Sequence, residues 1–373
     1  MKLLLLGTNI TTGGAQRVLL DLAGWLHAKD IKVTAAFFYD RDGLLSEWQS
    51  QFPFDLVCMD AWHQTDNIFQ RGVRLVRGWF RLLRFMRAEH FSGILTFTHD
   101  SNILGLPAAL LSGIPKRYGS HHVRYPSLSK LKIHLHSWVI NSSLSSGLIC
   151  VSTFTKEQAL EEGINPEKIS KIYNGIDPDT VKFNLEEQSE TRIRVEEDQR
   201  IVLAVGRLVQ QKGHEYLIRS APEVMATLPE VSFYIAGDGP LLSSLSSLIT
   251  SLKINDHFHL LGNRKDVPAL LADADLFVLP SIFEGLPISL LEAMAAGLPV
   301  ICTDIPATRD VIEEGINGVF VPPKDAGALS KAIIGLLSDQ KSQEKLALKG
   351  KQLIQETFSL AKMGQQYLNL FEE

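Results

Sequence analysis

The chain has 373 residues, of which 45% are hydrophobic and 21% charged, and its formal net charge is -5 at pH 7. This composition belongs to a folded protein of roughly two domains, and it excludes intrinsic disorder, collagen and a disulfide scaffold. The three cysteines, Cys58, Cys150 and Cys302, lie far apart without ligand-like pairing, so no structural zinc site is expected.

The first half alternates short apolar runs with amphipathic stretches. Strands are predicted over residues 2–7, 31–38, 93–98, 117–120 and 147–152, and helices over 16–28, 103–111 and 156–162. Strands separated by helices indicate a parallel sheet covered on both faces. The first apolar run is too short for a signal peptide, and no run approaches the roughly 18 apolar residues of a membrane span. We therefore expect a cytoplasmic protein.

Turn residues over 172–178 and a polar segment over 184–200 predict a domain boundary. The alternation then restarts, with elements predicted over 201–205, 215–225, 231–236, 241–252, 257–261, 267–271, 276–279, 328–337 and 361–371. The predicted organisation is an N-terminal domain over 1–175, a C-terminal domain over 176–355 and a C-terminal helix over 356–373 that packs back on the first domain. Residues 1–183 carry 20 basic and 16 acidic side chains, against 17 and 26 in the remainder, which favours different partners for the two domains.

A glycine-rich segment, Thr12-Gly13-Gly14-Ala15-Gln16-Arg17, lies between the first predicted strand and helix. Glycines there permit positive φ and let an anion approach backbone N–H groups at the start of a helix. The segment is not the dinucleotide-binding G-x-G-x-x-G pattern. It is interpreted either as an anion-binding loop or as a plain tight turn.

A second cluster, over 206–213, directly follows a predicted strand and carries Arg207 and Lys212. Two cations at the carboxyl end of a strand can bind one diphosphate, the guanidinium as a fork and the ammonium as a point charge. Two solvated loop charges are the alternative interpretation.

A third cluster spans residues 281–300. Pro287 is predicted at the first position of a short helix and Gly297 just past its end, which places Glu284 in the preceding loop and Glu292 within the helix. Apolar neighbours flank Glu292, so we expect a partly enclosed carboxylate that needs a hydroxyl or cation partner. A ligand-binding role and a structural ion pair both fit this pattern.

Together these segments resemble the retaining glycosyltransferases of family 4, which have the GT-B fold. The resemblance rests on Arg207 and Lys212 between their glycines, on Glu284 and Glu292 in an E-x7-E arrangement, and on four further segments in the family's order. Those segments are Cys150-Val151-Ser152, Tyr173-Asn174-Gly175-Ile176-Asp177, Ala236-Gly237-Asp238-Gly239-Pro240 and Phe277-Val278-Leu279-Pro280-Ser281. The resemblance covers nearly the whole chain and implies an α/β protein of two Rossmann-like, doubly wound domains facing a central cleft.

The resemblance implies a role for each matching residue. Arg207 and Lys212, beside Gly206, would neutralise the donor diphosphate, Glu284 would contact the donor sugar, and Glu292 would hold the ribose hydroxyls. Backbone N–H groups over the segment Gly285-Leu286-Pro287-Ile288 would support the phosphates.

The resemblance extends to the glycine loop and to the pocket for the donor. Gly13 and Gly14 would approach the diphosphate or the acceptor, although Gln16 stands where many family members carry a glutamate. Base and sugar selectivity are expected near Asn263 and Arg264.

Family members often carry a histidine that faces the donor sugar after a strand of the first domain. The segment Gly119-Ser120-His121-His122-Val123-Arg124 falls there, and its register favours His122 over His121. His99, beside Asp100, is a third candidate, and each of these residues could instead be a satisfied loop histidine.

The expected function is transfer of a sugar from a nucleotide sugar to a lipid-linked or polysaccharide acceptor, with retention, in cell-surface polysaccharide or glycolipid synthesis. Fixed cations and helix-start N–H groups can stabilise the leaving diphosphate without a metal, so no cofactor and no metal are expected. A sugar-nucleotide epimerase with the same fold and a non-catalytic nucleotide-sugar-binding protein are the alternatives.

Residues 70–90 form a basic amphipathic stretch. At 100° per residue its arginines, Arg71, Arg74, Arg77, Arg81, Arg84 and Arg87, fall on one side. The other side carries Leu75, Trp79, Leu82, Leu83 and Met86. This pattern is typical of a helix at an anionic membrane surface, or of a helix that packs on the core with solvated arginines. The negative net charge and the lack of a recognisable nucleic-acid module argue against a nucleic-acid partner.

Overall fold

The computed structural model describes residues 1–11, 13–124, 128–179, 193–196 and 198–372. The chain divides into two compact units, one formed by residues 1–175 and 360–373 and the other by residues 176–359. The chain therefore returns to the first unit at its C-terminal end.

The first unit contains a seven-stranded parallel sheet in the order β3-β2-β1-β4-β5-β6-β7. Its strands are β1 (Lys2–Ile10), β2 (Lys32–Asp40), β3 (Asp55–Cys58), β4 (Gly93–Phe97), β5 (Lys116–His121), β6 (Gly147–Cys150) and β7 (Ile169–Lys171). The interior strand β1 pairs Leu4 with Thr34 on one side and with Ile94 on the other. Residues 3–6 are fully buried, as expected for a strand covered on both faces.

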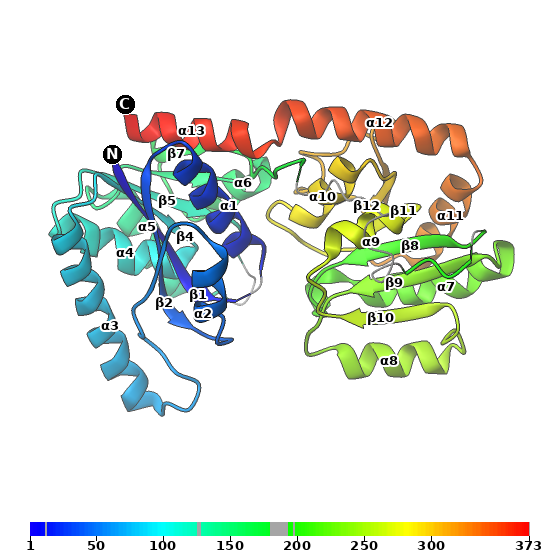
Figure 1. Ribbon diagram of the computed structural model, residues 1–373, viewed down its shortest axis with the longest axis horizontal. Helices are drawn as coiled ribbons and strands as arrows, with labels where there is room; N and C mark the ends of the chain where they lie inside the picture. The colour runs from blue at the N-terminus through cyan, green and yellow to red at the C-terminus, as the bar shows by residue number, and fades with distance from the viewer. Residues whose placement is uncertain (12, 125–127, 180–192, 197, 373) are drawn as a thin grey trace. The chain divides into compact units, whose positions relative to one another are not determined.

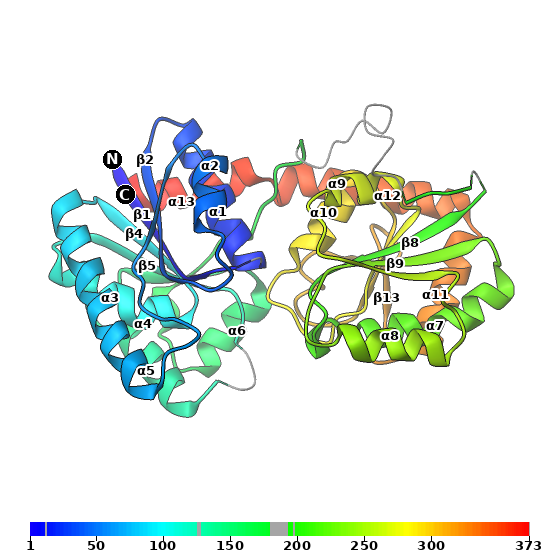
Figure 2. The ribbon, with the colours of Figure 1, turned by 60° about the horizontal axis from the view of Figure 1, so that its bottom comes forward.

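Helices cover both faces of this sheet. They are α1 (Gly14–Ala28), α2 (Leu45–Gln51), α3 (Ile68–Glu89), α4 (His99–Leu111), α5 (Lys130–Asn141), α6 (Thr153–Glu161), the 3-10 helix η1 (Pro166–Lys168) and α13 (Leu360–Glu372). α1 packs with α13 on one side, and α3, α4 and α5 pack successively on the other (Figure 2). Gly364 of α13 lies directly against the ring of Trp25, and Phe371 packs edge-on against Tyr118.

The second unit contains a six-stranded parallel sheet in the order β10-β9-β8-β11-β12-β13 (Figure 1). Its strands are β8 (Arg200–Val205), β9 (Val231–Ala236), β10 (Phe258–Gly262), β11 (Leu276–Leu279), β12 (Val300–Thr303) and β13 (Val319–Val321). The intervening helices are η3 (Gln210–Lys212), α7 (His214–Thr227), α8 (Leu242–Ser251), α9 (Val267–Asp273), α10 (Ile288–Ala296), α11 (Ala326–Leu337) and α12 (Gln340–Thr357). α7 contacts α8 and α11 on one face, and α10 contacts α9 and α12 on the other.

Several predicted boundaries differ from the structure in ways that matter for the site. The helix after β4 begins at His99 and not at Ile103, which places that histidine in its first turn. Pro287 is the N-cap of α10 and not its first helical residue, whereas Gly297 ends the helix in the left-handed conformation, as predicted. Gly13 is extended at φ -172°, so the glycine loop does not use positive φ at this residue.

Candidate functional site

Two loops at the carboxyl ends of neighbouring strands form the centre of the candidate site in the second unit. One loop follows β8 and carries Arg207 and Lys212, and the other follows β11 and carries Glu284. β8 and β11 are adjacent in the parallel sheet, so both loops emerge at the same edge. Ligands of open α/β sheets bind at this edge.

The two cations of the first loop differ in their surroundings. Lys212 Nζ lies 2.6 Å from Glu284 Oε1, and the lysine side chain is 16% exposed. Its methylene carbons pack against Gly206. Arg207 is exposed, and its side chain makes no hydrogen bond or ion pair to the residues that the structure describes. Arg207 is therefore free to bind an anion, while Lys212 is held in place by a carboxylate.

Glu284 is held by two donors. Its Oε1 accepts a hydrogen bond from Ser281 Oγ at 2.7 Å as well as the contact from Lys212. Glu284 is only 7% exposed, so its charge needs both partners. The free capacity of its carboxylate can accept hydrogen bonds from hydroxyl groups of a ligand.

Further hydrogen bonds join the two loops into one structure. Ile282 N donates to Gln211 O at 2.7 Å, and Gln211 Nε2 donates to Phe283 O at 2.9 Å. Thr303 Oγ1 at the end of β12 donates to Ser281 O. The positions of Lys212 and Glu284 are consequently fixed by the backbone as well as by their own contact.

Two glycines permit close approach of the loops after β8, β9 and β11. Gly213 has φ +62°, and a Cβ built on it would lie 2.1 Å from Pro280 O. Gly237, after β9, has φ +152°, and its Cβ would lie 2.0 Å from Gly206 O. An L side chain at either position meets both an unfavourable φ and backbone atoms that cannot move aside.

The segment Gly285-Leu286-Pro287-Ile288 leads into α10, whose N-terminus has no side-chain cap. An uncapped helix start leaves backbone N–H groups available to an anion. Glu292 is half-buried within α10 and has interaction partners in the structure. Its predicted partial enclosure agrees with this burial.

Asn263 and Arg264 follow β10 in the second unit. Asn263 is exposed, whereas Arg264 Nε bonds Asp266 Oδ1 at 2.7 Å. This contact raises the pKa of Arg264 and lowers that of Asp266. The charge of Arg264 is thus already paired within its own loop.

The glycine loop of the first unit lies at the carboxyl end of β1. Gly13 caps α1 through its backbone, since Arg17 N donates to Gly13 O at 2.9 Å. Gln16 Nε2 reaches back to Asn9 O at 3.2 Å and Asn9 Oδ1 at 3.1 Å. Gly14 is exposed, and Thr12 lies outside the described residues. An amide at position 16 can thus bond both acceptors of Asn9, which a glutamate carboxylate could not.

The candidate histidines of the first unit have different environments. His122 stacks on Phe97 with ring centroids 5.3 Å apart, and its Nε2 bonds Ser120 Oγ at 2.8 Å. Burial lowers the pKa of His122 to about 4. His121 is more deeply buried, and it lies with His99 in a cluster that also contains two residues absent from the predicted site.

Two family models match the chain. The model for glycosyltransferase family 4 matches residues 12–180, and the model for glycosyl transferases group 1 matches residues 186–353. The chain is a family-4 glycosyltransferase.

Relatives and solved structures agree with this assignment. The glycosyltransferase is 27% identical to the UDP-Gal:alpha-D-GlcNAc-diphosphoundecaprenol alpha-1,3-galactosyltransferase of Escherichia coli. The aligned 314 residues cover 78% of this chain and 81% of that protein. It is also 27% identical to the N,N'-diacetylbacillosaminyl-diphospho-undecaprenol alpha-1,3-N-acetylgalactosaminyltransferase of Campylobacter jejuni, over 80% of this chain and 81% of that protein. The structure of Anabaena HepE in complex with UDP and glucose matches with a TM-score of 0.85, at 21% identity, over 100% of this chain and 99% of that chain. The predicted GT-B fold is confirmed.

The cluster residues that sequence reasoning missed are His136 in α5 and Glu162 after α6. His136 Nδ1 lies 2.8 Å from Glu162 Oε2, and His99 Nε2 lies 3.1 Å from Glu162 Oε1. No spacing in the sequence of the glycosyltransferase connects these residues, because they come from separate elements that meet only in the folded unit.

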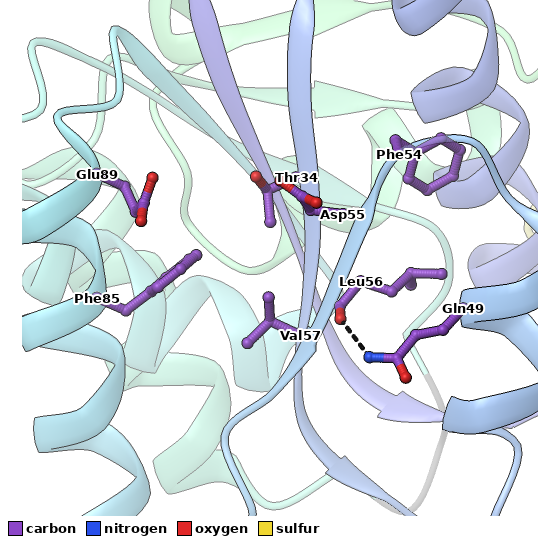
Figure 3. Close-up of a pocket in the computed structure, with 8 residues that line it drawn as sticks. All are labelled: Thr34, Gln49, Phe54, Asp55, Leu56, Val57, Phe85 and Glu89. Carbon is purple, nitrogen blue, oxygen red and sulfur yellow. Dashed lines mark hydrogen bonds between the residues drawn. The ribbon is translucent and has the colours of Figure 1, made fainter.

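A separate hollow of about 330 Å³ lies beside the edge strand of the first sheet (Figure 3). Thr34 and Asp55 line it near the start of β2 and β3, and Glu89 at the end of α3 lines it from the opposite side. The candidate motifs of the glycosyltransferase follow the carboxyl ends of strands. This hollow therefore lies apart from the predicted donor-binding residues.

α3 follows the predicted amphipathic pattern only in part. Leu82, Leu83 and Met86 are buried in the core, but Leu75, which was placed on the same side, is 40% exposed. The helix exposes further large apolar side chains, namely Ile68, Phe69, Val76 and Phe80. Among the described residues, no helix of the glycosyltransferase is long and apolar enough to cross a bilayer.

The arginines of α3 also fall into two groups. Arg74 bonds Asp66 at 2.8 Å and Asp60 at 3.1 Å, and Arg81 bonds Asp60 at 3.2 Å. The side chain of Arg77 is exposed and makes no ion pair or hydrogen bond to any residue in the described part of the chain. Arg84 shares both features. The helix thus presents unpaired cations beside exposed apolar groups.

Proposed function

We propose that this glycosyltransferase transfers a sugar from a UDP-sugar to a lipid-linked glycan, with retention, during synthesis of a cell-surface polysaccharide or glycolipid. The two relatives named above act on diphosphate-linked undecaprenol substrates according to their names. The E. coli relative is named for UDP-Gal, and HepE was solved with UDP and with UDP-glucose. These relatives support the donor and acceptor classes.

The free Arg207 beside the fixed Lys212 carries the proposal. Breaking the bond between the anomeric carbon and the phosphate oxygen places negative charge on the leaving diphosphate. Arg207 can bind that charge as a fork, and Lys212 can add a point charge that its contact with Glu284 has already positioned. Both groups interact more strongly with the diphosphate as negative charge develops on it. They therefore stabilise the transition state more than the bound donor.

The remaining residues of the proposed donor site have supporting roles. Backbone N–H groups of Gly285, Leu286 and Ile288 at the start of α10 support the phosphates, while Pro287 between them has no N–H and serves as the N-cap. Glu284 accepts hydrogen bonds from sugar hydroxyls, and Glu292 from ribose hydroxyls. Further contributions come from backbone at Gly13, Gly14 and Gly206, from the His122 ring towards the donor sugar, and from Asn263 and Arg264 near the base.

A thermal shift measurement tests the donor site. Saturating UDP is expected to raise the Tm of the purified enzyme by several degrees, because a ligand that binds only the native state stabilises it by mass action. Arg207→Ala is expected to lose most of this shift while keeping the Tm of the free enzyme. Arg219→Ala, an exposed arginine of α7, is the matched control and keeps the full shift. Equal shifts for both variants would contradict the assignment of Arg207.

The proposed transfer step uses no metal at the diphosphate. Fixed cations supply the charge that a magnesium or manganese ion supplies in other transferases. Turnover is therefore expected to be unchanged by added Mg²⁺ or Mn²⁺ and by brief treatment with EDTA. Activation by either ion, reversed by EDTA, would contradict this part of the proposal.

We further propose that α3 binds the anionic inner face of the cytoplasmic membrane. Arg77 and Arg84 lack internal partners, and apolar groups are exposed beside them on the same helix. α5 adds exposed apolar side chains at Leu131 and Trp138 on the same side of the sheet (Figure 2). Lysines and arginines near a lipid surface contribute about 1 kcal/mol each to binding.

Vesicle sedimentation tests this membrane contact. The enzyme is expected to sediment with vesicles that contain anionic lipid but not with neutral vesicles. Replacing Arg77, Arg81 and Arg84 by glutamine is expected to weaken binding at least tenfold, since three charges are removed. The matched control replaces three arginines of the second unit, Arg219, Arg264 and Arg309. Equal binding to both kinds of vesicle would count against the proposal.

A further inference from the structure

Three histidines and one glutamate form a buried cluster in the first unit. They are His99 in the first turn of α4, His121 at the end of β5, His136 in α5 and Glu162 just after α6. The side chains of His136 and Glu162 are fully buried, and His121 is 1% exposed. One potential ligand atom from each residue lies within 4.8 Å of the other three. Four elements of the fold therefore meet at these side chains.

The hydrogen bonds of the cluster fix two of its rings. Glu162 accepts from His136 Nδ1 at 2.8 Å and from His99 Nε2 at 3.1 Å. Asn102 Nδ2 donates to His136 Nε2 at 2.9 Å and to Ser120 O at 3.2 Å. Asn102 thus orients the His136 ring from behind, as outer-shell residues do around metal ligands.

His121 is not explained by these hydrogen bonds. Neither of its ring nitrogens has a hydrogen-bond partner among the described residues. Its ring lies beside those of His99 and His136, with centroids 4.8 Å and 5.9 Å away. A neutral imidazole has one donor and one acceptor, and burying both without a partner is unfavourable. A ligand or ion that binds a ring nitrogen of His121 would remove the free-energy cost of burying that nitrogen without a partner.

The carboxylate of Glu162 is paired with an arginine only at long range in the described part of the chain. Arg124 Nη1 is 4.0 Å from Glu162 Oε1, but Arg124 makes its shorter contact, at 2.6 Å, with Glu161. A buried carboxylate is costly unless an opposite charge compensates it. A cation between Glu162 and the three rings would supply this charge.

We propose that His99, His121, His136 and Glu162 bind one divalent transition-metal ion. Three imidazole nitrogens and one carboxylate oxygen suit Zn²⁺ best, and four protein ligands make a closed, structural site. Tetrahedral zinc with bonds of about 2.1 Å places its ligands roughly 3.4 Å apart, so the most distant pair closes by about 1.4 Å. The ion would join α4, β5, α5 and the end of α6, and one of its ligands, His121, immediately precedes His122 in the chain.

Binding rearranges protons within the cluster and adds none. The ion takes the place of the two ring protons that now point at Glu162. Each proton moves to the other nitrogen of its ring, because a neutral imidazole can carry its proton on either nitrogen. At His136 the Asn102 amide then turns its oxygen to accept the Nε2 proton and gives up its bond to Ser120 O. Its Nδ2 donates instead to Thr96 Oγ1, whose own proton remains directed at Tyr118 O. The ligand atoms are consequently His99 Nε2, His136 Nδ1, one nitrogen of His121 and an oxygen of Glu162.

Metal analysis of the full chain, purified without a polyhistidine tag, tests the proposal. About one Zn²⁺ per chain is expected after desalting, or after addition of Zn²⁺ and removal of the excess. Replacement by Co²⁺ is expected to give the visible absorption of a four-coordinate ion. Zn²⁺ at 100 times its Kd is expected to raise the Tm of metal-free protein by about 5–10 °C.

His121→Ala and Glu162→Gln are expected to lose the bound ion. His214→Ala is the matched control, because His214 is likewise buried without a partner for its ring nitrogens among the described residues but lies in the second unit. This control should keep the ion. If His121→Ala does not fold, His99→Gln at the rim of the cluster replaces it. A wild-type protein that binds neither Zn²⁺ nor Co²⁺, or variants that keep full stoichiometry, would overturn the proposal.

Discussion

Lys212→Met is expected to lower kcat by 100-fold or more. The substitution removes a cation that we place on the leaving diphosphate, and loss of one preorganised group at such a site costs roughly 10² to 10³ in rate. It also leaves Glu284 buried without its cation, which destabilises the second unit by up to about 3 kcal/mol for a pair that is largely but not fully buried. Steady-state kinetics and thermal unfolding measure the two effects separately.

The double variant Lys212→Met/Glu284→Gln separates catalysis from stability. Neutralising both partners removes the unpaired charge, so the Tm is expected to recover towards that of the wild type. The rate is not expected to recover, because the cation is still missing and the carboxylate that we place on the sugar hydroxyls is now an amide. If activity returned with the Tm, the Lys212–Glu284 contact would be structural, and Lys212 would have no part in the transfer step.

Gly213→Ala is expected to weaken donor binding at least tenfold. The new Cβ would lie 2.1 Å from Pro280 O, so the loop after β8 must move away from the loop after β11. Lys212 and Glu284 would then separate, and the UDP-induced Tm shift would fall by more than half. Calorimetric titration with UDP is expected to show a Kd at least tenfold higher for Gly213→Ala than for the wild type.

Gly315→Ala provides the matched control. Gly315 has φ +69°, close to the +62° of Gly213, but a Cβ there would meet no atom within 4 Å. Both variants carry the same cost of about 1 kcal/mol for a side chain in the left-handed region. Only the clash differs between them. Equal UDP affinity in the two variants would show that the close packing at Gly213 does not shape the site.

The residues of the proposed donor site could be named from the sequence, but their contacts could not. Arg207, Lys212 and Glu284 each follow a predicted strand, and parallel strands bring their carboxyl ends to one edge. Lys212 and Glu284 are 72 residues apart, however, and their contact depends on β8 and β11 being neighbours in the sheet. The order of strands in a sheet is not visible in the periodicity of a single sequence.

The first turn of α4, which contains His99, was not predicted from the sequence. Residues 99–102 are polar and read as a loop, because such side chains compete with helical hydrogen bonds. In the fold those side chains have partners outside the helix, as when Asn102 bonds Ser120 O. The prediction of no zinc site rested on the cysteines alone, so it did not consider ligands such as His136 that are brought together only by tertiary structure.

The most direct test of the central claim is product analysis with a UDP-sugar and a diphosphoundecaprenol-linked sugar. The purified enzyme is expected to release one UDP for each sugar that appears on the lipid-linked acceptor, in the same anomeric configuration as in the donor. Lys212→Met is expected to release neither product above background. Conversion of the UDP-sugar to an isomer without transfer, or tight UDP binding with no product for any UDP-sugar, would contradict the account.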